Sequence, residues 1–98
     1  MKKIALKFTY HIDIILVPDR VAQSPQKYQK AFDEWLYDKT NNHGCWIVIE
    51  GEKVAVSFDT ETFIDFLNNN SDFIGNEKAI ILERGIKVLS EKIPTLFF

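Results

Sequence analysis

Apolar residues alternate with mostly polar ones over the first part of the chain. Every even position from 4 to 16 is apolar, namely Ile4, Leu6, Phe8, Tyr10, Ile12, Ile14 and Leu16. A period of two is typical of a half-buried strand. Thirteen residues at about 3.3 Å each would span more than about 40 Å, which is long for a domain of this size. We therefore expect one long N-terminal strand that bends, bulges or overhangs before Pro18 ends it.

The next segment changes to helical spacing. Ser24 is a suitable N-cap and Pro25 suits the first helical position. The apolar residues that follow recur at intervals of three and four, namely Tyr28, Ala31, Phe32, Trp35 and Leu36. This spacing predicts an amphipathic helix. We expect it to end near Lys39, because residues 40–44 are a cluster of turn formers.

Residues 45–50 and 53–58 predict a β-hairpin, because both segments alternate around a pair of turn residues. That pair, Gly51 and Glu52, fits a two-residue loop with glycine first. Pairing Glu50 with Lys53 would place five apolar residues on one face, namely Ile47, Ile49, Val54, Val56 and Phe58.

Two further helices are expected in the C-terminal half. Asp59 or Thr60 can cap a short helix, which residues 68–71 terminate. Residues 79–83 are compatible with a strand, but five apolar residues recur at helical spacing, namely Ala79, Leu82, Ile86, Leu89 and Ile93. We expect a helix that Pro94 stops, and Gly85 is the main objection to it. The order strand, helix, hairpin, helix, helix predicts a small two-layer α+β fold, with residues 1–98 forming a single domain.

Length and cysteine content restrict the class of protein. The longest aliphatic run, residues 14–17, is far shorter than the roughly 20 residues needed to cross a bilayer. The first residues lack the organisation of a signal peptide. Cys45 is the only cysteine, so no disulfide can form within the chain, and an unpaired thiol suits a reducing compartment. We expect a cytoplasmic protein that does not bind membranes, with Cys45 buried as a structural residue.

Charge is distributed unevenly along the chain. Residues 33–77 carry ten acids and two bases, a local charge of −8, whereas residues 1–32 carry +4 and residues 78–98 carry +2. The overall charge of −2 therefore conceals a strongly polarised molecule. Such a charge distribution favours a basic partner. A basic patch of five lysines does not outweigh the acidic middle, so direct nucleic-acid binding is not expected.

Some of these acids oppose folding locally. Glu34 and Asp38 are like charges at i, i+4, and Asp38 falls in the expected last helical turn, where the helix dipole disfavours an anion. Glu61 and Asp65 repeat the like-charge spacing, although the dipole favours Glu61 near a helix start. Local arrangements that work against stability often mark functional sites. Solvation of the surface is the alternative role for all of these acids.

Two aromatic residues lie near these acids. Tyr37 is off the apolar stripe of its helix, and Trp46 is on the hairpin face opposite Ile47 and Ile49. Exposed aromatics beside carboxylates are typical of interface hot spots that face Arg and Lys. A hairpin covered on both faces remains the alternative for Trp46. The candidate partner-binding residues are Asp33, Glu34, Tyr37, Asp38, Trp46, Glu50, Glu52, Glu61 and Asp65.

The sequence carries no signature of catalysis. His11 and Asp13 lie two apart on one face of the expected strand, but two ligands do not complete a metal site. The serines lack the Gly-x-Ser-x-Gly context, and no glycine-rich loop precedes a helix. We therefore expect His11 and Asp13 to form a solvated strand face, and we expect no catalytic residue, metal or cofactor.

Residues 32–59 and 63–69 resemble small immunity proteins of bacterial toxin systems, including those of contact-dependent inhibition. The shared features are a helix with a Trp, a polar turn, a tight hairpin and an acidic, Phe-rich helix. The resemblance covers a third to a half of the chain. It implies a cytosolic inhibitor, without chemistry of its own, that occludes a toxin domain, often a basic nuclease. The long first strand and residues 96–98 are not matched.

We therefore expect a non-enzymatic inhibitory binding protein whose acidic surface and exposed aromatics neutralise a basic toxin domain, and which is a monomer or weak dimer. Two alternatives stay open. One is a small structural or oligomer-forming subunit that uses the long strand as a sheet edge. The other is a phage-encoded inhibitor of host defence.

Overall fold

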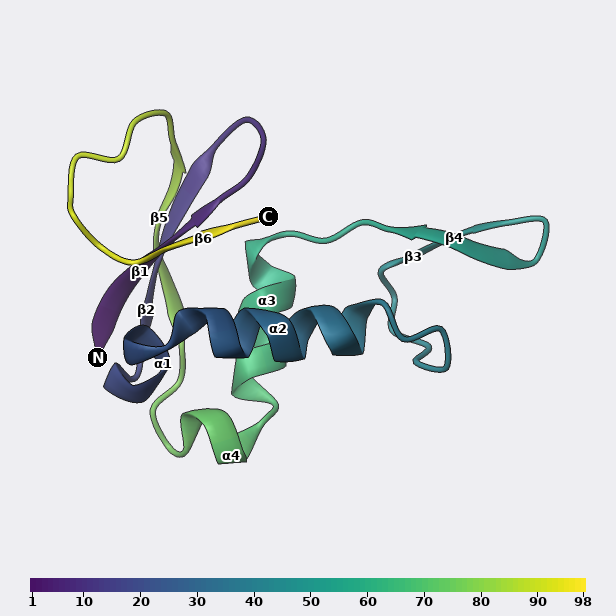
Figure 1. Cartoon of the computed structure of the whole chain (residues 1–98), viewed down its shortest axis with the longest axis horizontal. Helices are drawn as coiled ribbons and strands as arrows, with labels where there is room; N and C mark the ends of the chain where they lie inside the picture. Colours follow the sequence, from purple (N-terminus) through teal and green to yellow (C-terminus); the bar gives the residue numbers. More distant parts are fainter.

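The computed structural model describes residues 1–98, and it contains a four-stranded sheet, a separate two-stranded sheet and four helices (Figure 1). The α+β class is thereby confirmed. The elements are β1 (Lys2–Lys7), β2 (Ile12–Val17), α1 (Asp19–Gln23), α2 (Pro25–Leu36), β3 (Trp46–Ile49), β4 (Glu52–Val56), α3 (Thr60–Asn68), α4 (Ser71–Ile74), β5 (Ile80–Ile86) and β6 (Thr95–Phe97). The larger sheet has the order β5-β2-β1-β6, in which β6 is parallel to β1 and the other neighbours are antiparallel.

The long N-terminal strand was a wrong prediction, because the alternating segment folds back on itself. The N–H of Phe8 donates to the carbonyl of His11 at 2.9 Å and closes a turn between β1 and β2. The turn also changes which positions face the helices. Leu6 pairs with Asp13 and Ile4 with Ile15, so the inner face takes even positions in β1 and odd positions in β2. Both strands lie inside the sheet, and neither is an edge.

The predicted C-terminal helix was also wrong, since residues 80–86 form β5. Gly85 has φ +70°, which does not suit a helix and is accessible to glycine without strain. Hydrogen bonding to β2 favours a strand over a helix here, because β5 pairs with the edge of β2 that β1 leaves free. Local periodicity contains no information about such a distant partner.

The two central helices are confirmed. Pro25 begins α2, which ends at Leu36, three residues before the expected end near Lys39. Asp59 caps α3, and its carboxylate accepts hydrogen bonds from the N–H of Thr62 at 3.0 Å and from the hydroxyl of the same residue at 3.1 Å. Two short helices, α1 and α4, were not predicted. None of the helices has the length and apolar character that a membrane crossing requires.

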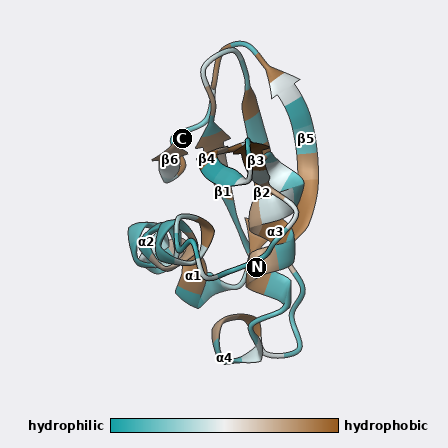
Figure 2. Cartoon of the chain, turned by 90° about the vertical axis from the view of Figure 1, so that its right-hand side faces the viewer, coloured by the Kyte–Doolittle hydropathy of each residue, from teal (hydrophilic) through white to brown (hydrophobic).

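The core lies between the inner face of the larger sheet and the helices, and aromatic rings occupy its centre. Figure 2 shows α2 to one side of β1, β2 and β5, with α4 at the bottom. Phe32 on α2 is fully buried, and four phenylalanine rings lie within 6.0 Å of its own, namely those of Phe58, Phe63, Phe66 and Phe98. Edge-to-face pairs of this kind contribute roughly 1 kcal/mol each beyond burial.

The β3–β4 hairpin projects away from this core (Figure 1). We call residues 46–56 the arm. The hairpin itself was predicted, but its register was not, because the turn consists of Glu50 and Gly51 and the pair that closes it is Ile49 with Glu52. Both turn residues have positive φ, 53° and 81°, as the favoured two-residue hairpin turn requires. The ladder also shifts register between Ile47 and Val48.

Candidate protein-binding site

The arm exposes large apolar side chains to solvent. Its two strands form a sheet of their own, and Val48 and Ile49 are 55% and 58% exposed. Ile47 and Val54 are exposed as well. The alternative that the hairpin is covered on both faces is therefore excluded. Exposed apolar side chains gathered on a projecting element are typical of a protein-binding site.

The end of the arm is acidic. Glu50 and Glu52 are exposed at the turn. The arm carries one base, Lys53, and its ammonium group already forms hydrogen bonds within the chain. It donates to the carbonyl of Lys39 and to the side-chain oxygen of Asn42, the latter at 2.7 Å. The two carboxylates at the turn therefore have no neutralising partner on the arm.

The loop between α2 and the arm is held by an aromatic stack. The ring of His43 lies 4.6 Å from that of Trp35 and 5.3 Å from that of Trp46, and it is nearly parallel to the latter. Its Nε2 donates to the carbonyl of Leu36 at 2.7 Å, and its Nδ1 accepts from the N–H of Cys45 at 3.3 Å. Both ring nitrogens are therefore engaged, and the imidazole acts as a structural connector between α2 and the arm.

Trp46 belongs to this connection as much as to the candidate binding surface. Its indole N–H donates to the carbonyl of Asn41 at 2.8 Å, and the ammonium of Lys53 lies 5.5 Å from its ring centre. The side chain is half-buried. We infer that the arm is fixed to the body at its base, while its outer part is free to contact a partner. Cys45, expected to be buried, is half-buried at this base.

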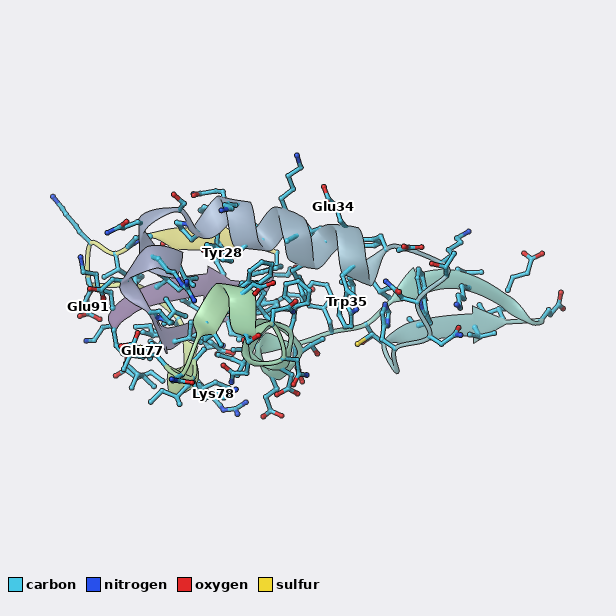
Figure 3. The ribbon with its side chains drawn as sticks, turned by 90° about the horizontal axis from the view of Figure 1, so that it is seen from below. Tyr28, Glu34, Trp35, Glu77, Lys78 and Glu91 are labelled. Carbon is cyan, nitrogen blue, oxygen red and sulfur yellow. The ribbon has the colours of Figure 1, made fainter.

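The acids near the end of α2 have different environments. Glu34 points outward from α2, whereas Trp35 points toward the interior (Figure 3). Partial burial raises the pKa of Asp33. Asp38 accepts from the N–H of Thr40 at 3.0 Å and from its hydroxyl at 2.7 Å, and these hydrogen bonds lower the pKa of Asp38.

Asp38 therefore has an ordinary structural role, and the interpretation that it works against the helix was wrong. The helix ends at Leu36, so Asp38 lies beyond the last turn and organises the loop that follows. Tyr37, the residue between them, is 57% exposed, as its position off the apolar stripe had suggested.

The two candidate acids on α3 also differ from each other. The carboxylate of Glu61 pairs with the guanidinium of Arg84 at 2.6 Å. This ion pair offsets the repulsion expected between Glu61 and Asp65. The carboxylate of Asp65 is exposed and has neither an ion pair nor a hydrogen bond.

A cavity of about 460 Å³ lies beside Asp65, between α2, the base of the arm and α3. Three aromatic side chains, those of Trp35, His43 and Phe66, line it together with Gly44, Cys45, Thr62, Asp65, Asn69 and Asn70. These residues are widely separated in the sequence. Of this group, the sequence identified Asp65 as a candidate, and it gave no signal for Trp35 or His43 beyond their aromatic character.

The predicted solvated face at His11 and Asp13 was wrong for Asp13, which is 4% exposed. Its carboxylate accepts from the hydroxyl of Thr60 at 2.5 Å and from the N–H of Gly85 at 2.9 Å. The Nε2 of His11 lies 3.6 Å away. The turn between β1 and β2 explains the difference, because it turns Asp13 toward the helices. This carboxylate therefore connects β2, the start of α3 and β5.

No protein-family model, curated protein or solved structure matches this chain.

Proposed function

We propose that this protein is a non-enzymatic inhibitor that binds a protein with a basic surface and blocks its activity, as the immunity proteins it resembles do. The observation that carries the proposal is the arm, which projects from the core with exposed apolar sides and an acidic end. An apolar surface next to uncompensated carboxylates suits a partner site rich in Arg and Lys. A toxin nuclease domain acting in the cytoplasm is the partner class we favour.

The two parts of the arm would contribute to different steps of binding. The carboxylates of Glu50 and Glu52 would accelerate encounter with a positively charged surface. The apolar residues behind them, such as Val48 and Ile49, would lose water on contact and slow dissociation. Tyr37, exposed at the end of α2, adds an aromatic contact of the kind found at interface hot spots.

The oligomer-forming alternative loses one of its two premises, the long N-terminal strand at a sheet edge, because β1 and β2 are both interior strands. Its other premise, the apolar C-terminus, is unaffected. An inhibitor of host defence encoded by a phage would use the same surface, so it differs in partner and not in mechanism.

Growth protection tests the proposal. The chain is co-expressed with a candidate toxin encoded beside it in its genome, and survival is measured. Wild-type chain should protect, and the double variant Val48→Asp and Ile49→Asp should lose protection. Val88→Asp, which changes an even more exposed valine outside the arm, is the control and should protect fully. Circular dichroism confirms that each variant is folded. Full protection by the double variant would show that the arm is not part of the binding site. Failure of the wild-type chain to protect would contradict the inhibitor function.

A further inference from the structure

The cavity beside the arm offers unused hydrogen-bonding groups. Asp65 contributes a carboxylate with no partner, and the side-chain amide of Asn69 forms no hydrogen bond. The neighbouring amide of Asn70 is engaged, since it donates to the carbonyl of Phe66 at 2.6 Å. Asp65 and Asn69 are four residues apart on and just after α3, so their side chains lie on the same side of the helix. The free carboxylate of Asp65 is an acceptor only, and the free amide of Asn69 adds one acceptor oxygen beside its two N–H donors.

The electrostatics of the cavity favour a cation. No lysine or arginine lines it, and His43, which does line it, has both ring nitrogens hydrogen-bonded to backbone groups. The nearest acid on the same helix face, Glu61, is already neutralised by Arg84. Asp65 is thus the one carboxylate in the cavity, and its charge is available to a bound group. A cation entering beside Trp35 and Phe66 would also lose water, which strengthens its attraction to the carboxylate.

The walls of the cavity favour a flat group. The rings of Trp35 and Phe66 lie 5.3 Å apart with 41° between their planes. A guanidinium is planar, is weakly hydrated, stacks on aromatic faces and binds carboxylates through two parallel hydrogen bonds. An ammonium group is more strongly hydrated and lacks the planar pair of donors. The combination of ring, carboxylate and amide therefore matches arginine better than lysine.

We propose that this cavity receives an arginine side chain of the partner, with its guanidinium against Trp35 and its N–H groups donating to Asp65 and Asn69. This inference rests on the proposed function, because it identifies which residue of a basic partner the surface recognises. The acidic end of the arm would attract the basic surface in general. The cavity would select one arginine of the partner, at a defined distance from the residues that contact the acidic end of the arm.

The inference is tested on the chain of residues 1–98 without any partner, using N-acetyl-arginine amide as the probe. Binding is followed by the NMR shifts of the Asn69 side-chain amide and the Trp35 indole. Saturable shifts are expected with the arginine probe. N-acetyl-lysine amide and the uncharged N-acetyl-citrulline amide should each bind at least about tenfold more weakly, because a charge-assisted hydrogen bond is lost or weakened.

Two variants separate the cavity from general acidity. Asp65→Asn should weaken binding of the arginine probe by at least about tenfold. Asp72→Asn, which removes an exposed acid outside the cavity, is the matched control and should leave binding unchanged. Equal binding of all three probes, no saturable binding of the arginine probe, or an unchanged Asp65→Asn variant would each overturn the inference.

This test and the growth assay can fail independently. The double arm variant Val48→Asp and Ile49→Asp should retain binding of the arginine probe while losing protection. A wild-type chain that protects but does not bind the probe would overturn the arginine cavity and leave the inhibitor function standing. A chain that binds the probe but never protects would contradict the inhibitor function instead.

Discussion

At the scale of single residues, Asp13 is the most consequential polar group in the core. Its carboxylate accepts hydrogen bonds from Thr60 and Gly85. Asp13→Ala would leave the buried hydroxyl of Thr60 and the N–H of Gly85 without this acceptor, and we expect a loss of roughly 2–4 kcal/mol in the free energy of unfolding. Urea denaturation measures it. His11→Ala is the control and should cost under about 1 kcal/mol. Its ring is half-buried, and its Nε2 lies 3.6 Å from the Asp13 carboxylate, too far for a hydrogen bond. Equal losses would mean that the carboxylate is not the connecting group.

Asp38 provides a pH-dependent prediction at the same scale. Its pKa is lowered by the hydrogen bonds from Thr40, so folding favours the ionised form. The resulting stability is present above the unfolded-state pKa of about 3.9 and is lost as pH falls through the folded-state pKa. We expect the stability difference between wild type and Asp38→Ala to shrink as pH decreases from about 6 to about 2. Denaturation at several pH values checks this, and a difference that grows toward acid pH would contradict the assignment.

At the scale of elements, the arm should be the least protected pair of strands. A two-stranded sheet without a covered face is marginally stable in water. Its turn places Gly51 at φ +81°, where a Cβ is strained, so Gly51→Ala should destabilise the arm by about 1 kcal/mol. Hydrogen exchange would show faster exchange in β3 and β4 with no change in β1 and β2. Global destabilisation by this variant would show that the arm and the core unfold together.

Elements with local signals were predictable from the sequence, and elements that depend on distant partners were not. Ser24-Pro25 and Asp59 mark the starts of α2 and α3, and Gly51 marks the hairpin. By contrast, β5 forms because it can pair with the free edge of β2, and β6 forms because it can pair with the free edge of β1. The turn after β1 contains no glycine or proline, so the hydrophobic pattern of two short strands looked like that of one long strand. The cavity was unpredictable for a related reason, since only the tertiary fold brings Trp35 and Asp65 together.

At the scale of the whole molecule, the separation of charges predicts a salt effect on binding. The acids of residues 33–77 include the end of the arm, whereas the larger sheet carries four bases of the flanking segments, namely Lys2, Lys3, Lys7 and Arg84. Raising ionic strength from about 0.05 to about 0.5 M should slow association with the partner far more than it accelerates dissociation. Surface plasmon resonance gives both rates. An association rate that is constant over this range would mean that the acids do not contribute to encounter.

The position of the arm gives this charge separation a direction. The molecule extends 44 Å along its longest axis, and the acidic turn lies at one end of that axis while the strand that begins with Lys2 lies toward the other (Figure 1). Opposite charges held at opposite ends form a permanent electric dipole, and a dipole experiences a torque in an external field. Near a positively charged surface the molecule would rotate until the arm leads. The partner would therefore meet an already aligned ligand, and fewer collisions would be lost to wrong orientations.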